Sequence, residues 1–213
     1  KKHRYVLFFQ NRIPSDVFLK NSLFESVLIK GPKLLKSRRI LGEQLLMPFA
    51  VKKAKLDLFF APWYSAPLLS YCPKTVIGCW DVSCNSHASH YRIQERISFG
   101  FFSPSSCRKA QGIITCSHYD SRQIQKYFAI PPERICVVQF AADEKFKPAD
   151  NLCQLDAFRA KYGLPKKYIL SMGIIIKRRS VDVIIDAFKE VYRDCPDLGL
   201  VVIGRNATVP FVN

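Results

Sequence analysis

The chain has 213 residues, of which 48% are hydrophobic, and its formal net charge is +16. This composition supports a sizeable buried core in one or two domains and excludes an intrinsically disordered chain. Because the printed sequence has no run of 18 or more apolar residues, it predicts no membrane-spanning helix.

The positive charge is concentrated at the start of the chain. Residues 1–55 hold 13 Lys or Arg against 3 Asp or Glu, a surplus of 10 that leaves 6 for the remaining residues. Such a surface suits nucleic acid, anionic lipid or no partner beyond solvent. Since no RNA-binding or DNA-binding motif accompanies the charge, we expect no nucleic-acid partner and favour an anionic membrane surface.

The eight cysteines form no C-x-x-C pair, and some lie in apolar runs, as Cys116 does in GIITC. This usage indicates reduced thiols and a cytoplasmic location. Cys84, His87 and His90 have the spacing C-x-x-H-x-x-H, but only Cys79 is available as a fourth ligand, so we expect no metal. The sequence has no G-x-G-x-x-G, no P-loop and no hydrolase elbow, which argues against dinucleotide oxidoreductases, P-loop ATPases and serine hydrolases.

In the first two thirds of the chain, short apolar runs alternate with helical patterns. A helix is predicted over 34–54, with Leu41, Leu45 and Phe49 on its apolar face and a kink at Pro48. A helix over 93–110 should break at Pro104. Strands are predicted at 5–9, 27–29, 56–61, 75–78 and 112–116.

Two further features stand at predicted strand ends. Trp63 and Tyr64 belong to a proline-bounded loop after the strand 56–61, which suits either a sugar or lipid site or internal packing. Ser117 and Asp120 have nearly the spacing of a capping box, with Asp in place of Glu, and predict that a helix begins there.

The stretch 168–186, YILSMGIIIKRRSVDVIID, brings an apolar strand, a glycine and three cations before a helix. Ser180 is the predicted cap of that helix, and a second strand is predicted at 198–203. Strand, helix and strand of these lengths predict a right-handed βαβ unit, which puts Gly173 and the cations at the carboxyl end of a parallel strand. Phosphate is the first candidate ligand there, and a merely solvated turn is the alternative.

This stretch resembles the donor-diphosphate loop of family-four retaining glycosyltransferases, in which a strand reading like YILxxG is followed by an Arg-Lys pair. Gly173 matches the loop glycine and Arg178 the arginine. Arg179 stands where the family usually has lysine, Ser180 where it has glycine or asparagine, and Ile174 where a small or cationic residue is common.

Three further segments resemble the same family. Residues 39–48 resemble R-x-x-W-E-Q-x-x-x-P with Gly42 in place of the tryptophan, and Trp80-Asp81 stands where the family commonly has His-Asp. Phe140-Ala141 replaces an Asn-Gly pair within the stretch 110–148. In that stretch the residues in register with the family pattern are Ile113, Thr115, Ser117, Ile130, Pro131, Val137, Val138, Asp143, Phe146 and Pro148.

The resemblance implies an α/β fold of the GT-B type, with two Rossmann-like doubly wound domains. Residues 1–150 would form the acceptor-side domain without its amino-terminal part, and 151–213 the truncated start of the nucleotide-sugar domain. We therefore expect the chain to be a piece of a longer protein. The family's E-x7-E carboxylate pair would lie beyond Asn213, so the 213-residue chain alone is expected to be inactive.

The implied activity is retaining, mannosyltransferase-like transfer of a sugar from a GDP-sugar or UDP-sugar to a glycan or lipid-linked acceptor, without cofactor or metal, at the inner face of the membrane. The donor phosphates would contact Gly173, Lys177, Arg178 and Arg179, the two arginines being catalytic. The acceptor or sugar side would hold Trp63, Tyr64, Trp80 and Asp81. A non-catalytic GT-B-like binding module and a basic nucleic-acid-binding domain are the alternatives.

Overall fold

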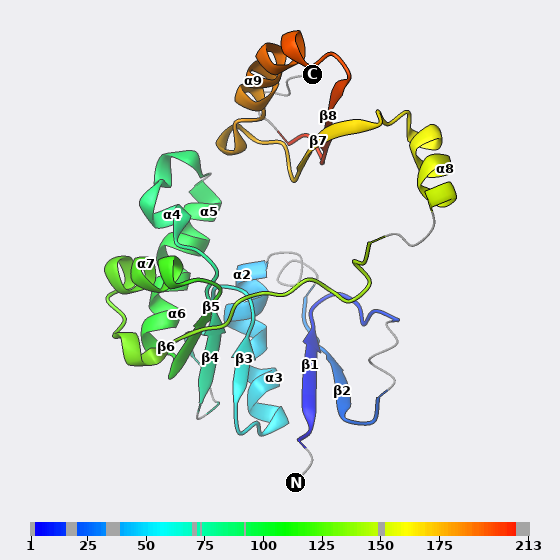
Figure 1. Cartoon of the computed structure of the whole chain (residues 1–213). Coiled ribbons are helices and arrows are strands. Elements are labelled where there is room, and N and C mark those ends of the chain that lie inside the picture. The colour runs from blue at the N-terminus through cyan, green and yellow to red at the C-terminus, as the bar shows by residue number, and fades with distance from the viewer. Residues whose placement is uncertain are drawn as a thin grey trace. The chain divides into compact units, whose positions relative to one another are not determined.

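The computed structural model describes residues 3–15, 21–32, 39–69, 72, 74–91, 93–148 and 152–207 (Figure 1). The chain divides into two compact units, Lys1–Ala141 and Ala142–Asn213, here called unit 1 and unit 2. The predicted boundary near residue 150 falls among residues 149–151, outside the described residues, so the predicted domain division stays a prediction.

The described residues of unit 1 form two sheets, and the strand pairs within both sheets are parallel. In the smaller sheet β1 (Tyr5–Phe9) pairs with β2 (Phe24–Leu28). The larger sheet has the order β3-β4-β5-β6 (Figure 1). The predicted strands at 5–9 and 75–78 are confirmed, whereas β2 begins earlier than residue 27 and β3 is shorter than predicted. The strands of the larger sheet are Phe59–Ala61, Thr75–Gly78, Gly112–Thr115 and Ile135–Val137.

The helices of unit 1 include two π-helical segments, which explain where the predicted breaks occur. Pro48 and Pro104 each lie in the first turn of a helix that follows a π segment. The helix continues through each junction, because the Met47 N–H donates to the Gly42 carbonyl and the Ser103 N–H to the Ser98 carbonyl. A proline ring clashes with the carbonyl four residues earlier in an α-helix, and the wider π turn before each proline accommodates it. The segments are α2 (Arg39–Leu41), η2 (Gly42–Leu46), α3 (Met47–Ala54), α4 (Ser83–Ser86), η3 (Ala88–His90), α5 (Ile93–Ile97), η4 (Ser98–Phe102), α6 (Ser103–Lys109), α7 (His118–Phe128) and η5 (Pro132–Arg134).

The core of unit 1 lies where the four-stranded sheet meets the helices α3, α6 and α7. Ile77 and Ile113 on neighbouring strands are 0% and 1% exposed, and Phe128 of α7 is 1% exposed. Burying an apolar side chain of this size contributes about 1.5–3 kcal/mol. The sheet that carries the carboxyl-edge loops of unit 1 therefore packs on a buried apolar core.

The predicted apolar face of the helix 34–54 is wrong. Leu41, Leu45 and Phe49 are exposed, whereas Pro48 and Val51 are buried. The reason is a pair of hydrogen bonds made by the side chain of Gln44: its Nε2 donates to the Ala66 carbonyl (3.1 Å), and its Oε1 accepts from the Leu68 N–H (2.9 Å). These bonds set the rotation of the helix about its axis.

The helix predicted to begin at Ser117 is confirmed as α7. The Ser117 hydroxyl accepts a hydrogen bond from the Asp120 N–H (3.0 Å) and donates one to the Asp120 carboxylate. The carboxylate thus binds the capping hydroxyl, not the backbone N–H of a standard capping box. The cap fixes how the chain leaves β5.

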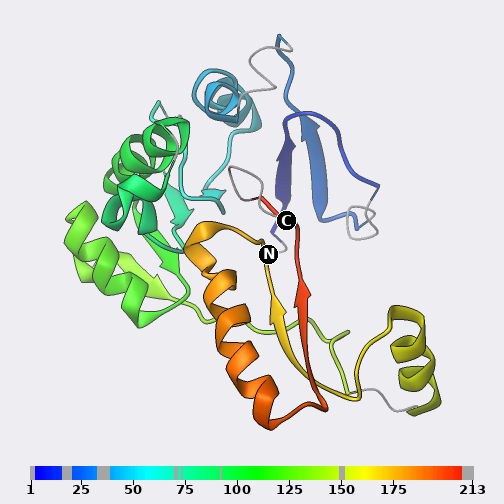
Figure 2. The ribbon, with the colours of Figure 1, turned by 90° about the horizontal axis from the view of Figure 1, so that it is seen from above.

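Unit 2 is a βαβ unit preceded by a helix. The strands β7 (Lys167–Met172) and β8 (Leu198–Ile203) pair in parallel, as predicted, with Met172 opposite Ile203. The helix α9 (Val181–Asp194) connects them and lies along the sheet (Figure 2), after the 3₁₀ turn η6 (Lys177–Arg179). The helix α8 (Leu152–Tyr162) ends at Gly163, whose φ is +61°. Among the described residues of unit 2 none is fully buried.

The predicted helix cap at Ser180 is also wrong. It occupies the position before α9, but its φ is +47°, in the left-handed region, and its side chain makes no capping hydrogen bond. A capping hydroxyl requires an extended backbone that turns it toward the first-turn N–H groups, and Ser117 has that conformation whereas Ser180 does not.

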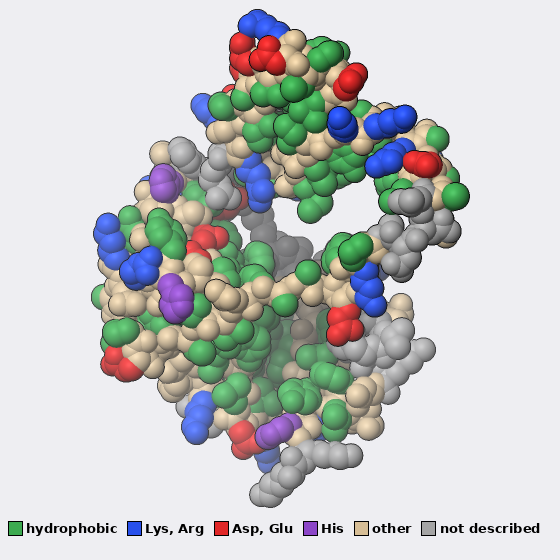
Figure 3. Space-filling model, in the orientation of Figure 1, with side chains coloured by type: hydrophobic (Ala, Val, Ile, Leu, Met, Phe, Trp, Pro, Cys, Tyr) green, Lys and Arg blue, Asp and Glu red, His purple; other side chains and the backbone are tan. Residues whose placement is uncertain are grey.

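Hydrophobic side chains remain at the surface of both units (Figure 3). Within the described residues, no helix has both the length and the apolar character needed to cross a bilayer.

Candidate functional site

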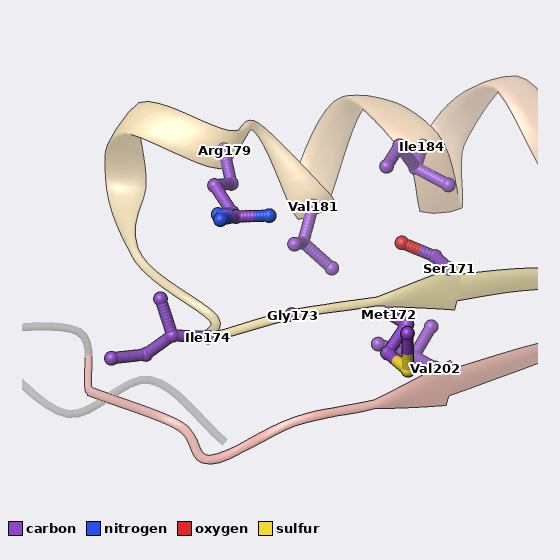
Figure 4. Close-up of a pocket in the computed structure, with 8 residues that line it drawn as sticks. All are labelled: Ser171, Met172, Gly173, Ile174, Arg179, Val181, Ile184 and Val202. Atoms are coloured by element: carbon purple, nitrogen blue, oxygen red, sulfur yellow. The ribbon is translucent and has the colours of Figure 1, made fainter. Parts of the chain in front are cut away.

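A pocket of about 370 Å³ lies in unit 2 between the carboxyl end of β7 and the start of α9 (Figure 4). Its polar side chains are Ser171, on the strand, and Arg179, on the turn before the helix. The full lining consists of Ser171, Met172, Gly173, Ile174, Arg179, Val181, Ile184 and Val202. A strand end, a glycine loop and a helix start therefore share one cavity.

Gly173 gives the loop its shape. Its φ is +142°, a conformation that residues with a Cβ rarely adopt. A Cβ at this position would lie 2.5 Å from Nη1 of Arg179, so the guanidinium occupies the space that the missing side chain leaves. Figure 4 shows this guanidinium reaching down from the turn toward the loop.

The loop is held in place by the segment that follows β8. The Gly173 N–H donates to the Ile203 carbonyl (2.9 Å), and the Ile175 N–H donates to the Arg205 carbonyl (3.0 Å). A Cβ on Gly204 would lie 1.8 Å from the Gly173 carbonyl oxygen, so only glycine permits this approach. The two strand-end segments consequently support each other through their backbones.

The electrostatics of the pocket favour an anion. No carboxylate of the described residues forms an ion pair with Arg179. Val181, which also lines the pocket, is the first residue of the 14-residue helix α9. The first N–H groups of a helix lack partners within it and carry the positive end of its dipole. A cation and a helix start therefore meet at the same cavity.

The structure brings together only some of the predicted phosphate ligands. Gly173 and Arg179 line the pocket, whereas Lys177 lies exposed on the same 3₁₀ turn and does not line it. The side chain of Arg178 lies outside the described part of the chain. Ser171 was missed, although strand alternation puts it two residues before Gly173 on the face that α9 covers.

In unit 1 the four residues predicted for the acceptor or sugar side meet at the carboxyl ends of β3 and β4. The Tyr64 N–H donates to the Gly78 carbonyl (2.8 Å), and the rings of Trp63 and Tyr64 lie 5.1 Å apart. The Tyr64 hydroxyl donates to Oδ2 of Asp81 (2.7 Å). Backbone and side-chain bonds thus join the two loops.

The carboxylate of Asp81 is well supplied with donors. Besides the Tyr64 hydroxyl, it accepts the N–H of Ser83 (2.9 Å) and the hydroxyl of Ser83. It therefore both orients a hydroxyl and caps the turn that opens α4. Burial, and then the hydrogen bond to Asp81, raise the pKa of Tyr64, so this phenol stays protonated and acts as a donor.

Trp80 also connects the loops that follow β3 and β4. Its indole N–H donates to the Pro62 carbonyl (2.9 Å), and its ring lies 4.9 Å from that of Phe140. A Cβ on Gly78 would lie 2.4 Å from this indole, so Gly78 makes room for it. Trp63 is 55% exposed and presents its ring to solvent.

The thiols and the C-x-x-H-x-x-H segment suggest no further site. None of the eight cysteines forms a disulfide bond. Within the described residues, no three or more His, Cys, Asp or Glu side chains are grouped to hold a metal ion. The expectation that the protein needs no metal stays a prediction.

No protein-family model matches the sequence, and no curated protein matches it. Among solved structures the chain is similar to a glycosyltransferase from Rickettsia africae ESF-5, with a TM-score of 0.46 and 11% identity over 96% of this chain. The match covers 61% of that structure's chain, so this chain spans less than two thirds of its length. A likeness at this level identifies no activity. The structure itself establishes a mixed α/β fold with parallel sheets.

Proposed function

We propose that the chain is the part of a retaining glycosyltransferase of the GT-B type that holds the diphosphate of a nucleotide sugar. The observation that carries the proposal is the guanidinium of Arg179 against Gly173 in a pocket at the carboxyl end of β7. Ligands of open α/β sheets bind at this edge. The sequence resemblance of residues 168–186 to a donor-diphosphate loop supports the same assignment.

The proposed role of Arg179 is charge stabilisation. A guanidinium offers two parallel N–H groups to phosphate oxygens, and each charge-assisted bond contributes about 1.5–3 kcal/mol when water is excluded. When the bond between the sugar and the diphosphate breaks, negative charge develops on the departing phosphate. A cation already in place stabilises that charge without reorganisation. Lys177 and Arg178 are proposed to assist from the same turn.

The sugar or acceptor side is proposed to lie in unit 1, at Trp63, Tyr64, Trp80 and Asp81. The exposed indole of Trp63 suits stacking on a sugar ring. The Tyr64 hydroxyl donates its proton to Asp81, so its oxygen suits acceptance of a hydrogen bond from a sugar hydroxyl. The acceptor is proposed to be a glycan or a lipid-linked glycan, and the donor a GDP-sugar or UDP-sugar.

The first test is calorimetric titration of the 213-residue chain with GDP and with UDP. Arg179→Ala should weaken binding of the favoured nucleotide about 10-fold to 100-fold, because the guanidinium contact is lost and water screens part of its contribution at this exposed side chain. Arg193→Ala is the matched control, since Arg193 lies in the last turn of α9, does not line the pocket, and pairs with Glu190 at 2.8 Å. The proposal fails if both variants bind like the wild type.

Two outcomes separate the other candidate functions. Tighter binding of polynucleotides than of nucleoside diphosphates, falling steeply with salt and equally in both variants, would favour a basic nucleic-acid-binding domain. Nucleotide binding combined with no sugar transfer by the natural full-length protein would favour a non-catalytic binding module.

A further inference from the structure

An exposed apolar stripe runs along the helical segment formed by α2, η2 and α3. Leu41, Leu45 and Phe49 follow one another at intervals of four residues, and their exposed fractions are 39%, 49% and 67%. Lys53 stands at the next interval, beside Lys52, and both lysines are exposed. These five residues are here called the outward stripe.

The outward stripe is held rigidly, because the opposite side of the same helical segment is anchored in unit 1. Pro48 and Val51 are buried, and the Gln44 side chain is hydrogen-bonded to the backbone at Ala66 and Leu68. A Cβ on Gly31 would lie 2.6 Å from a methyl carbon of Leu46, so this leucine packs against the loop after β2. The stripe therefore cannot turn inward without breaking these contacts.

Charge indicates what the stripe contacts. It ends in two exposed lysines, Lys55 follows them, and the region 1–55 carries a surplus of 10 positive charges. Leucine and phenylalanine side chains enter the boundary between headgroups and acyl chains, while lysines extend to the anionic headgroups. A nucleic acid would use the lysines but would leave the leucine side chains exposed.

We propose that the outward stripe docks unit 1 on an anionic lipid surface. Leu41, Leu45 and Phe49 insert at the acyl boundary, and Lys52 and Lys53 contact the headgroups. The proposal is independent of the sugar-transfer assignment, because it concerns a different unit and needs no nucleotide.

The same chain contains a matched comparison. Ile93, Ile97 and Phe101 have the same spacing and are 66%, 51% and 59% exposed, and Phe101 lies in the π segment η4. The charges beside the two sets differ in position. Glu95 and Arg96 lie on α5 itself, whereas Lys52 and Lys53 end the outward stripe and Glu43 lies earlier on that segment. Arg108 and Lys109, at the end of α6, donate to the carbonyls of Phe128 and Leu68. Similar apolar exposure with a different arrangement of charge makes Phe101→Ser the control for Phe49→Ser.

The test is flotation of the 213-residue chain with vesicles of phosphatidylcholine and phosphatidylserine, compared with phosphatidylcholine alone. We expect the wild type to float with the anionic vesicles, and Phe49→Ser to weaken this binding by at least about tenfold, because a ring is lost from the acyl boundary. Phe101→Ser should bind like the wild type. Lys52→Gln with Lys53→Gln should weaken binding at low salt and remove much of its salt dependence. Circular dichroism checks that each variant is folded.

Several results would overturn the proposal. Absence of binding to anionic vesicles would do so, as would equal losses in Phe49→Ser and Phe101→Ser. If the chain does not bind vesicles but forms a concentration-dependent dimer that Phe49→Ser abolishes, the stripe would instead contact a second copy of the chain. Binding to polynucleotide that the lysine variants abolish, without vesicle binding, would assign it to nucleic acid.

Discussion

The two parallel sheets that carry the candidate sites are supported in different ways. The four-stranded sheet of unit 1 is packed against helices, and Ile77, Ile113 and Phe128 are almost completely buried. The two-stranded sheet of unit 2 has one connecting helix, and none of its described residues is buried. Parallel sheets are usually covered on both faces. In unit 1 a packed core therefore supports loops that hydrogen bonds also join, whereas in unit 2 the backbone bonds from Gly173 to Ile203 and from Ile175 to Arg205 hold the pocket.

The largest expected effect is the loss of a core aromatic in unit 1. Phe128→Ala should lower the free energy of unfolding of unit 1 by about 3–5 kcal/mol, because it leaves a cavity in a packed core. Phe188→Ala, on the half-buried face of α9, should lower that of unit 2 by less than about 2 kcal/mol, since less apolar area is lost. Hydrogen exchange resolved by peptide separates the two units, and equal effects would contradict the comparison.

A backbone clash should produce the next largest effect. Gly204→Ala puts a Cβ 1.8 Å from the Gly173 carbonyl oxygen, which must separate the two strand-end segments. We expect a cost of about 1–3 kcal/mol in unit 2, together with weaker nucleoside diphosphate binding. Gly100→Ala is the control, because no heavy atom lies within 4 Å of its added Cβ. Unchanged nucleotide affinity in Gly204→Ala would show that the pocket does not depend on the contact between the two strand-end segments.

Two serines at helix starts allow a smaller comparison. Ser117→Ala should destabilise unit 1 by about 1 kcal/mol, because the Asp120 N–H loses its acceptor. Ser180→Ala should leave the free energy of unfolding of unit 2 within about 0.5 kcal/mol of the wild type, because no capping bond is lost. Urea unfolding of the single variants measures both, and a loss in Ser180→Ala as large as in Ser117→Ala would contradict the assignment.

The smallest expected effect is a loss of stability of unit 1 at alkaline pH, through the thiol of Cys116. Burial, and then the hydrogen bond to Asp120, raise the pKa of Cys116 above its ordinary value of 9.0. A raised pKa means that the folded state holds the proton more tightly than the unfolded state. The resulting stability is complete below about pH 9 and is lost as the pH rises through the folded pKa.

The matched variant for this effect is Cys116→Ala. Unfolding of unit 1 measured between about pH 8 and pH 10 should depend less on pH in this variant than in the wild type. An identical pH dependence in both proteins would show that the thiol does not contribute.

Part of the pocket could be predicted from the residues alone. The strand, glycine and cation order placed Gly173 and Arg179 at a carboxyl strand end, because short apolar runs joined by a helix pair in parallel. The sequence did not predict that the Arg179 guanidinium fills the space over Gly173 or that Gly204 approaches from the next strand end. Both features depend on backbone contacts between segments that are distant in the chain.

The sequence by itself determined the alternation of strands and helices, the exact bounds of β4 and β8, and the cap at Ser117. These features depend on residues that are close to one another in the chain. The tertiary structure alone decided which side of the helical segment 39–54 faces outward. Apolar residues occupy both of its sides, so periodicity could not choose between them. The side chain of Gln44 fixes the orientation of the segment through hydrogen bonds to the backbone of Ala66 and Leu68, which are more than 20 residues away in the chain.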